Sequence, residues 1–113
     1  MAWKAFNVVG VTYKDHPGET MRRVDKIAKY AKQGSVFGLV RDPSNEYDFN
    51  AIEVRQYFKS GASIRLGYVP RELAKKLAPA MDKGWEPKVQ FGRKFIDKAT
   101  CEVKGFQLRY EEN

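Results

Sequence analysis

Hydrophobic and polar positions alternate over several short stretches of this chain, which is the pattern of half-buried β-strands. The clearest case is the run from Ile52 to Phe58. Every second residue from Ile52 onward faces one side, and Glu53, Arg55 and Tyr57 lie between them. Comparable runs predict six strands in all, over residues 3–13, 36–41, 52–58, 64–68, 88–96 and 100–110.

Two further stretches show apolar residues at helical spacing instead. The first is expected to begin with Pro17 at the first helical position, to run to about residue 33 and to be capped by Gly34. The second opens at Pro70, and Pro79 is expected to end or kink it because proline lacks the N–H that an interior turn requires. The opposite face of the first helix is basic: Arg22, Arg23, Lys26, Lys29 and Lys32.

Two glycines mark irregularities in this pattern. Gly10 interrupts the first strand, as expected where a strand bulges or another group approaches the backbone. In the last strand the apolar parity switches at Lys104-Gly105, which predicts a bulge there. Six short strands and two helices indicate one α+β domain over residues 1–113, a small antiparallel barrel or strongly curved sheet with the helices at its ends.

The composition narrows the class of protein. No run approaches the roughly 20 apolar residues of a membrane span, and the first residues lack the apolar core of a signal peptide. Cys101 is the only cysteine, so no disulfide forms within the chain, and we expect it to be a small buried residue. These features favour the cytoplasm, including the bacterial nucleoid or a phage-infected cell.

The 21 lysines and arginines exceed the 14 acidic residues, which gives a net charge of +7. Such an excess attracts nucleic acid or another polyanion, although solubility alone would also account for it. The basic face of the first helix leaves open a second role, that of an adaptor for an acidic partner protein.

Candidate catalytic groups are few. His16 is the only histidine, so a zinc site or a histidine-based nucleophile is not credible. The loop from Asp42 partly matches a calcium-binding loop, but Tyr47 occupies the place that needs glycine. A metal-dependent nuclease using Asp42, Glu46 and Asp48 remains the enzymatic alternative. We therefore expect a non-catalytic domain without cofactor or metal.

Aromatic residues are interleaved with basic ones along the predicted strands and loops. This arrangement suits single-stranded nucleic acid, because bases stack on the rings while phosphates meet the charges. A small barrel also needs aromatic residues in its core, so both interpretations stay open. The residues concerned are Tyr13, Tyr47, Tyr57, Tyr68 and Phe91 with Lys14, Arg41, Arg55, Arg65, Arg71 and Arg93.

Three blocks of sequence resemble the HIRAN domain family. They are Val8-Val-Gly-Val-Thr-Tyr13, the stretch Leu39-Val-Arg-Asp-Pro-Ser-Asn-Glu-Tyr-Asp-Phe-Asn-Ala-Ile-Glu-Val54, and Leu66-Gly-Tyr-Val-Pro-Arg-Glu-Leu-Ala74. The resemblance covers about residues 6 to 85, and the chain looks like a stand-alone bacterial or phage member. It implies a modified OB-like barrel that binds single-stranded DNA at a free 3′-hydroxyl end.

The resemblance also implies roles for individual residues. Tyr47 would stack on a base, and Tyr13 would line the pocket for the terminal nucleotide. Asp48 would accept a hydrogen bond from the 3′-hydroxyl. Asn45 would contact the same nucleotide or hold the loop, and Arg71 would meet the backbone phosphates. Asn50 and Arg41 are expected to be structural, with Arg41 pairing with Asp42 or Asp48.

This sequence departs from the family at three places near those residues. Thr12 stands where DNA-end-binding members have arginine, Glu46 replaces proline, and Tyr68 replaces histidine as a possible stacking or hydrogen-bonding substitute. A further aromatic contact would come from Phe91 or Phe95. The resemblance thus implies a DNA-binding module for 3′ ends in repair, replication at forks or phage DNA processing, acting with a separate helicase-like or nuclease protein and no membrane.

Overall fold

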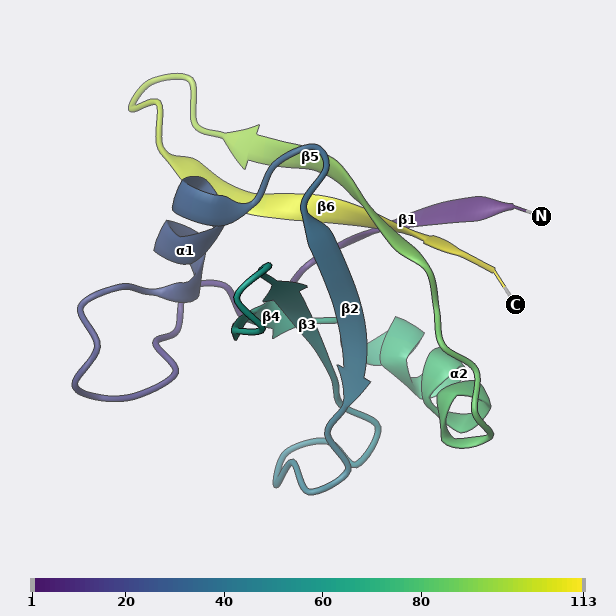
Figure 1. Cartoon of the computed structure of the whole chain (residues 1–113). Coiled ribbons are helices and arrows are strands. Elements are labelled where there is room, and N and C mark those ends of the chain that lie inside the picture. The colour runs from purple at the N-terminus through teal and green to yellow at the C-terminus, as the bar shows by residue number, and fades with distance from the viewer. Residues whose placement is uncertain (1, 113) are drawn as a thin grey trace.

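The computed structural model describes residues 2–112 and contains six strands and two helices in the order expected from the sequence. Figure 1 shows two small sheets crossing one another, with a helix near each end of the assembly. The elements are β1 Trp3–Asn7, α1 Arg23–Tyr30, β2 Val36–Arg41, β3 Ile52–Tyr57, β4 Ser63–Tyr68, α2 Arg71–Asp82, β5 Val89–Ile96 and β6 Val103–Glu111.

All strand pairs are antiparallel and form two three-stranded sheets, β1-β6-β5 and β2-β3-β4. The sheets join through Val9 and Tyr68, whose backbones exchange two hydrogen bonds of 2.9 Å. On the other side β2 lies beside β5, and the rings of Phe37 and Phe91 stack with centroids 6.4 Å apart. The result is the small OB-like barrel that the sequence predicted.

The core fills the space between the two sheets. Its fully buried members include Ile52, Val54 and Leu66 from the first sheet and Phe106 and Leu108 from the second. Each comes from an alternating strand position, so binary patterning places these side chains inside. No helix within residues 2–112 is long and apolar enough to cross a membrane.

The first strand is shorter than expected, because the chain changes sheets after Asn7. Val8 donates its backbone N–H to Phe106 in β6, whereas Val9 already pairs with Tyr68 in β4. Gly10 then turns the chain with φ +71°, and its carbonyl approaches the side chain of Arg23. The prediction of a strand to residue 13 was therefore wrong, while the prediction of a close approach at Gly10 is confirmed.

The first helix is also shorter than predicted and begins at Arg23, not at Pro17. Its first backbone N–H groups bond back to the carbonyls of Tyr13 and Val11, so the preceding residues form a loop beside the helix. Gly34 is not its cap either. The helix ends before Ala31, and Gly34 lies in the turn that leads to β2.

The second helix passes through Pro79 and ends at Asp82, so of the two effects expected of this proline, an end or a kink, the end at Pro79 was wrong. Proline removes one intrahelical hydrogen bond, but the last turn is held by others. Gly84, with φ +105°, donates to Met81, and Trp85 donates to Ala80, which is the Schellman arrangement of a helix end. Gly84 therefore closes the helical segment.

Bulges adjust the curvature of both sheets. In β6 the pairing passes from Gly105 to Val103 while β5 advances by one residue, so Lys104 is the extra residue and the predicted bulge is confirmed. In β4 the pairing skips Leu66 in the same way. The next residue, Gly67, has φ +154°, and a Cβ there would lie 2.5 Å from the carbonyl oxygen of Val9. A side chain would therefore push apart the two strands that close the barrel.

Cys101 is exposed, contrary to the expectation of a buried residue. It lies in the turn between β5 and β6, where Asp97 and Glu102 close the turn with a backbone hydrogen bond of 2.9 Å. Cys101 has φ +60° and donates its N–H to Asp97. The hairpin bends back at this point, so its side chain faces outward instead of continuing the inward alternation of β6.

Candidate nucleic-acid interface

One hollow of about 640 Å³ collects residues from four separate parts of the chain. It lies where the 10–22 loop, the 42–51 loop, the end of β4 and the start of α2 meet. All six residues singled out from the sequence line it, which places the three distant sequence blocks at one site. These residues are Tyr13, Asn45, Tyr47, Asp48, Tyr68 and Arg71.

The 42–51 loop is held in shape by Asn45. Its side-chain oxygen accepts hydrogen bonds from the backbone N–H groups of Tyr47 at 2.9 Å and Asp48 at 3.1 Å. Its amide nitrogen donates to Asp42 at 3.3 Å. These contacts are an Asx-type turn, in which a short side chain replaces a backbone partner. Of the two expected roles of Asn45, the structure shows that of holding the loop.

Two tyrosines stand out from the walls of the hollow. Tyr47 is 82% exposed and Tyr13 is 66% exposed. A large ring left this open at the mouth of a hollow offers a flat apolar face to a ligand. Phe91 and Phe95 do not line the hollow. Phe91 points into the core against Phe37, and Phe95 lies beside Arg93 on β5.

Asp48 presents a carboxylate to the hollow while serving the loop. Its Oδ1 accepts the backbone N–H of Asn50 at 2.9 Å, and its backbone carbonyl accepts the N–H of Ala51 at 3.0 Å. Within residues 2–112 its Oδ2 has no hydrogen-bond donor. The side chain is half-buried, so one carboxylate oxygen is fixed in orientation and still free to accept a hydrogen bond.

Tyr68 forms the back of the hollow between two arginines. The guanidinium carbon of Arg23 lies 5.4 Å from the ring centroid, and that of Arg65 lies 5.6 Å away. These cation–π contacts hold the Tyr68 ring in one orientation. The residue remains half-buried. Arg23 is only 8% exposed, yet it lines the hollow. The helical spacing of the sequence predicts Arg23 on the outer face of a helix, so its place in this wall is not predictable from that pattern.

Asp15 holds Arg23 in position. Its carboxylate accepts hydrogen bonds from Arg23 Nε at 2.9 Å and from Lys26 Nζ at 3.0 Å, and it lies 3.6 Å from Arg65. Burial acts to raise the pKa of Asp15, but the hydrogen bonds from Arg23 and Lys26 outweigh it, so this pKa lies below its usual value. This ion cluster fastens the 10–22 loop to α1 and β4.

The same contacts correct the expected basic face of the first helix. Arg23 is buried, and Lys26 is neutralised by Asp15 and Glu19. Only Arg22, Lys29 and Lys32 of that face remain exposed, and Arg22 contacts Asp25. The surface proposed for an acidic partner protein is therefore much smaller than the sequence indicated.

Arg71 is the first residue of α2 and is exposed at the rim of the hollow. Pro70 precedes it at the start of the helix, so Arg71 stands beside the positive end of the helix dipole. Lys14 lines the same rim. Within the described part of the chain neither cation forms an ion pair, which leaves both charges available to an anion.

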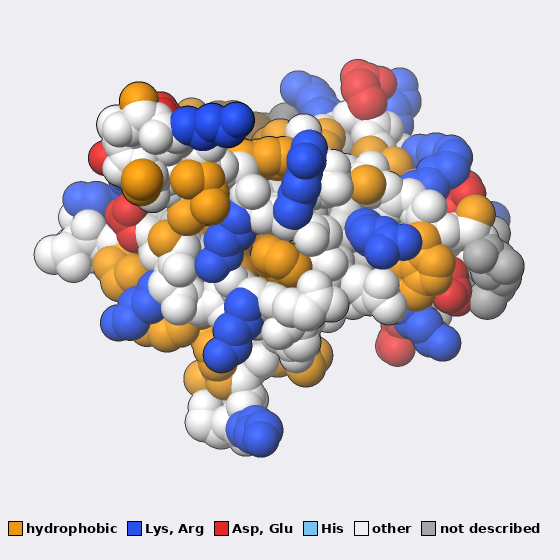
Figure 2. Space-filling model, turned by 90° about the horizontal axis from the view of Figure 1, so that it is seen from above, with side chains coloured by type: hydrophobic (Ala, Val, Ile, Leu, Met, Phe, Trp, Pro, Cys, Tyr) orange, Lys and Arg blue, Asp and Glu red, His pale blue; other side chains and the backbone are white. Residues whose placement is uncertain are grey.

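Lysine and arginine are not confined to this rim. The side of the molecule formed by α1, β5 and β6 carries basic side chains across its middle, with acidic ones towards its edges (Figure 2). The positive charge on this face is thus spread broadly, as expected for a protein attracted to a polyanion.

Arg41 does not pair with Asp42 or Asp48 as expected. Its Nε lies 2.9 Å from Asp82 of α2, and its Nη1 donates to the carbonyl of Ala51 at 2.8 Å. It is structural, as the sequence indicated, but with a different partner. Among residues 2–112 no group of three or more histidine, cysteine or acidic side chains is placed to hold a metal ion.

The sequence also matches a known protein family. The family model of the HIRAN domain, which describes the sequences of the family, matches residues 5–105. A Fanconi-associated nuclease 1 homolog from Oryza sativa subsp. japonica is 46% identical over 52 residues, which is 46% of this chain but only 5% of the rice protein.

Two solved structures have the same fold. A crystal structure of a protein from Lactobacillus plantarum is 25% identical with a TM-score of 0.60, and the match covers 98% of each chain. The crystal structure of the HIRAN domain of human HLTF is also 25% identical, with a TM-score of 0.56 and coverage of 96% of this chain and 74% of that one.

An OB-like barrel with an aromatic and basic hollow at its end defines a small DNA-binding module. The chain belongs to the HIRAN domain family.

Proposed function

We propose that this domain binds single-stranded DNA and takes the 3′-terminal nucleotide into the hollow. The observation that carries the proposal is the convergence of two exposed tyrosines, an oriented carboxylate and two free cations on one hollow. Stacking groups, a hydroxyl acceptor and phosphate partners are the three kinds of contact that the end of a DNA strand requires.

Each residue has a distinct part in this proposal. Tyr47 stacks on the terminal base, and Tyr13 covers its other side or the sugar. The free oxygen of Asp48 accepts the hydrogen bond of the 3′-hydroxyl. Arg71 and Lys14 contact the phosphates behind the terminal nucleotide, with the start of α2 adding its dipole.

Asp48 also makes the proposed binding selective for a 3′-hydroxyl over a 3′-phosphate. A carboxylate accepts a hydrogen bond from a hydroxyl but repels a phosphate at the same place. Unit charges about 4 Å apart repel by roughly 1 kcal/mol even in bulk water, and more at a protein surface. A 3′-phosphate is therefore expected to weaken binding at least about tenfold, which corresponds to roughly 1.4 kcal/mol.

Fluorescence anisotropy with one oligonucleotide sequence in three forms tests this directly. The forms are a free 3′-hydroxyl, a 3′-phosphate, and a circular strand without ends. The first should bind most tightly, and equal binding of all three would contradict end recognition. Asp48→Asn should reduce the difference between hydroxyl and phosphate, because the amide removes the repulsion while keeping the shape.

The salt dependence provides a second readout. Each phosphate neutralised on a single strand contributes about 0.7 to the slope of log K against log salt. Replacing Arg71 by alanine should reduce the slope by about that amount, whereas Tyr47→Ala should lower affinity and leave the slope unchanged.

The relative named as a Fanconi-associated nuclease 1 homolog supports a proposal about the wider setting of this activity. We propose a role in DNA repair, replication or phage DNA processing, in which a separate helicase-like or nuclease protein supplies the enzymatic step. Purified domain incubated with labelled DNA and Mg²⁺ should leave the strand intact. Cleavage abolished by substitution of Asp42 or Asp48 would replace the binding role with a nuclease.

A further inference from the structure

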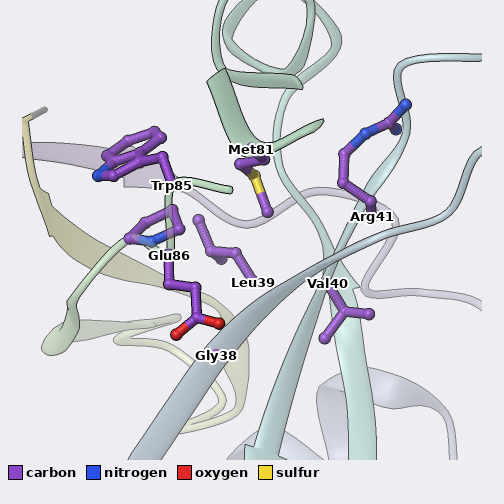
Figure 3. A pocket seen from close by; sticks show the side chains of 8 residues that line it. Gly38, Leu39, Val40, Arg41, Met81, Trp85 and Glu86 are labelled. Atoms are coloured by element: carbon purple, nitrogen blue, oxygen red, sulfur yellow. The ribbon is translucent and has the colours of Figure 1, made fainter. Parts of the chain in front are cut away.

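A second hollow lies along the seam where the two sheets face each other without pairing. It measures about 380 Å³ and separates residues 38–41 of β2 from residues 85–87, which lead into β5. Figure 1 shows β2 and this segment diverging towards α2, and Figure 3 shows the hollow from close by. It shares no lining residue with the hollow assigned to DNA.

Within residues 2–112 no strand pairs with the edge of β2 that faces this seam. Asp42 donates its N–H to Ala51, and in an antiparallel ladder the residues that bond across alternate with residues that point away. Leu39 and Arg41 are the alternate positions, so their N–H and C=O groups face the seam. The carbonyl of Ile52, opposite Arg41, bonds to Val69 instead, as this alternation requires.

Apolar side chains form one wall of the seam. Leu39, Met81 and Trp85 are each partly buried and packed against the core. Leu39 and Met81 point towards one another, with Trp85 beside them (Figure 3). An apolar side chain entering here would therefore extend the existing core.

Among the residues that line the seam, Arg41 and Glu86 carry charges, and they differ in whether the charge is paired. Arg41 is neutralised by Asp82, with Nε and Oδ1 2.9 Å apart. Glu86 is exposed, and it forms no ion pair with any residue between 2 and 112. The unpaired carboxylate of Glu86 favours a ligand that brings a positive charge to this position.

We propose that the seam binds an extended peptide segment of a partner protein, which adds a strand to β2. Backbone groups of the peptide pair with Leu39 and Arg41, an apolar side chain enters beside Met81 and Trp85, and a lysine or arginine of the peptide meets Glu86. Strand addition is a common mode of peptide recognition, with affinity from the backbone and selectivity from alternate side chains. The inference does not depend on the proposed DNA binding.

Nuclear magnetic resonance with the ¹⁵N-labelled protein tests the backbone part. The probe is the peptide acetyl-Thr-Val-Lys-Val-Thr-amide, and its control is the same peptide with alternate amides N-methylated. We expect the probe to shift the amide signals of Leu39 and Arg41 and to slow their hydrogen exchange at least threefold. The methylated peptide should have no such effect. No shift with the probe at millimolar concentration, or equal binding of both peptides, would overturn the proposal.

A charge exchange tests the role of Glu86. Glu86→Lys should lower the affinity for the lysine peptide at least threefold. The same variant should bind a peptide with glutamate in place of lysine more tightly than the parent does. Glu72→Lys makes the same charge change on an exposed residue of α2 outside the seam and should change neither affinity. Shifts of the Leu39 and Arg41 amides by an oligonucleotide, or their protection in a dimer of the free protein, would assign the seam to another occupant and overturn the proposal.

Discussion

The guanidinium of Arg23 lies 5.4 Å above the ring centroid of Tyr68, and its Nη1 donates to the carbonyl of Gly10 at 2.8 Å. Three parts of the chain therefore meet at one side chain: α1, the end of β4 and the turn after β1. Because Gly10 and Tyr68 both line the hollow proposed for DNA, the shape of that hollow depends on an arginine at the start of a helix.

Arg23→Lys tests this dependence. Lysine keeps the positive charge but lacks the planar fork that reaches Asp15 and Gly10 together. We expect the free energy of unfolding to fall by about 1–2 kcal/mol, the value of one or two lost hydrogen bonds. Urea denaturation measures it. Arg22→Lys, at the exposed neighbouring position, should change stability by less than about 0.5 kcal/mol. Equal effects at both positions would show that the fork is unimportant.

Tyr47→Ala is expected to weaken binding of single-stranded DNA by about 1–3 kcal/mol, the value of one stacked base. Its thermal midpoint should stay nearly unchanged, because the ring is 82% exposed. Phe49→Ala is a matched control in the same loop. Phe49 is 70% exposed, but its ring contacts Arg41 and does not line the hollow. If both variants lose the same affinity, the loop acts only as a general apolar surface.

Gly67→Ala should destabilise the fold more than other glycine substitutions. The new Cβ would lie 2.5 Å from the carbonyl oxygen of Val9, within the backbone contact that joins the sheets. We expect a loss of about 2–3 kcal/mol from strain at this position, measured by urea denaturation. Gly18→Ala is the control, because its Cβ would have no neighbour within 4 Å. Similar stability of both variants would mean that the barrel tolerates opening at Val9 and Tyr68.

Acid should weaken the ion cluster around Asp15. Its pKa is lower in the folded protein than the usual value of 3.8, so the unfolded chain binds the proton more readily. The stability that Asp15 supplies is therefore complete above about pH 5 and is lost as the pH falls through the lowered folded value. Asp15→Asn should be less stable than the parent at pH 7, and the difference should shrink towards pH 3. A difference that is constant with pH would exclude this linkage.

The elements that alternate regularly were the ones that the sequence predicted well. The bounds of β2 agree at both ends, and those of β3 and β4 agree within one residue, because apolar residues fill most of their inward positions, with the buried Gln56 of β3 as a polar exception. The extents of the first strand and of α1 were wrong for a tertiary reason. Val9 leaves one sheet for the other, and Asp15 and Glu19 bind side chains of α1 that the helical pattern had assigned to solvent.

The site was predictable to the extent that its residues lie in contiguous sequence blocks. Tyr47 and Asp48 lie in one loop. The turn-forming residues Asp42-Pro-Ser-Asn45 and the aromatic residues beside them indicate this loop in the sequence. Arg23 could not be found in this way, because only the folded 10–22 loop covers it. The pairing of Arg41 with Asp82 also depends on where α2 ends. Pro79 indicated an earlier end, so Asp82 was not expected to belong to the helix.

The exposed thiol of Cys101 makes the protein suited to single-molecule work. It is the only cysteine in the sequence, so one maleimide dye attaches at one known place without any substitution. The β5–β6 hairpin that carries it lies at the far end of the molecule from the 42–51 loop (Figure 1). A donor dye there and an acceptor on the oligonucleotide would report the direction in which a bound strand leaves the hollow, with the side chains proposed to contact DNA left untouched.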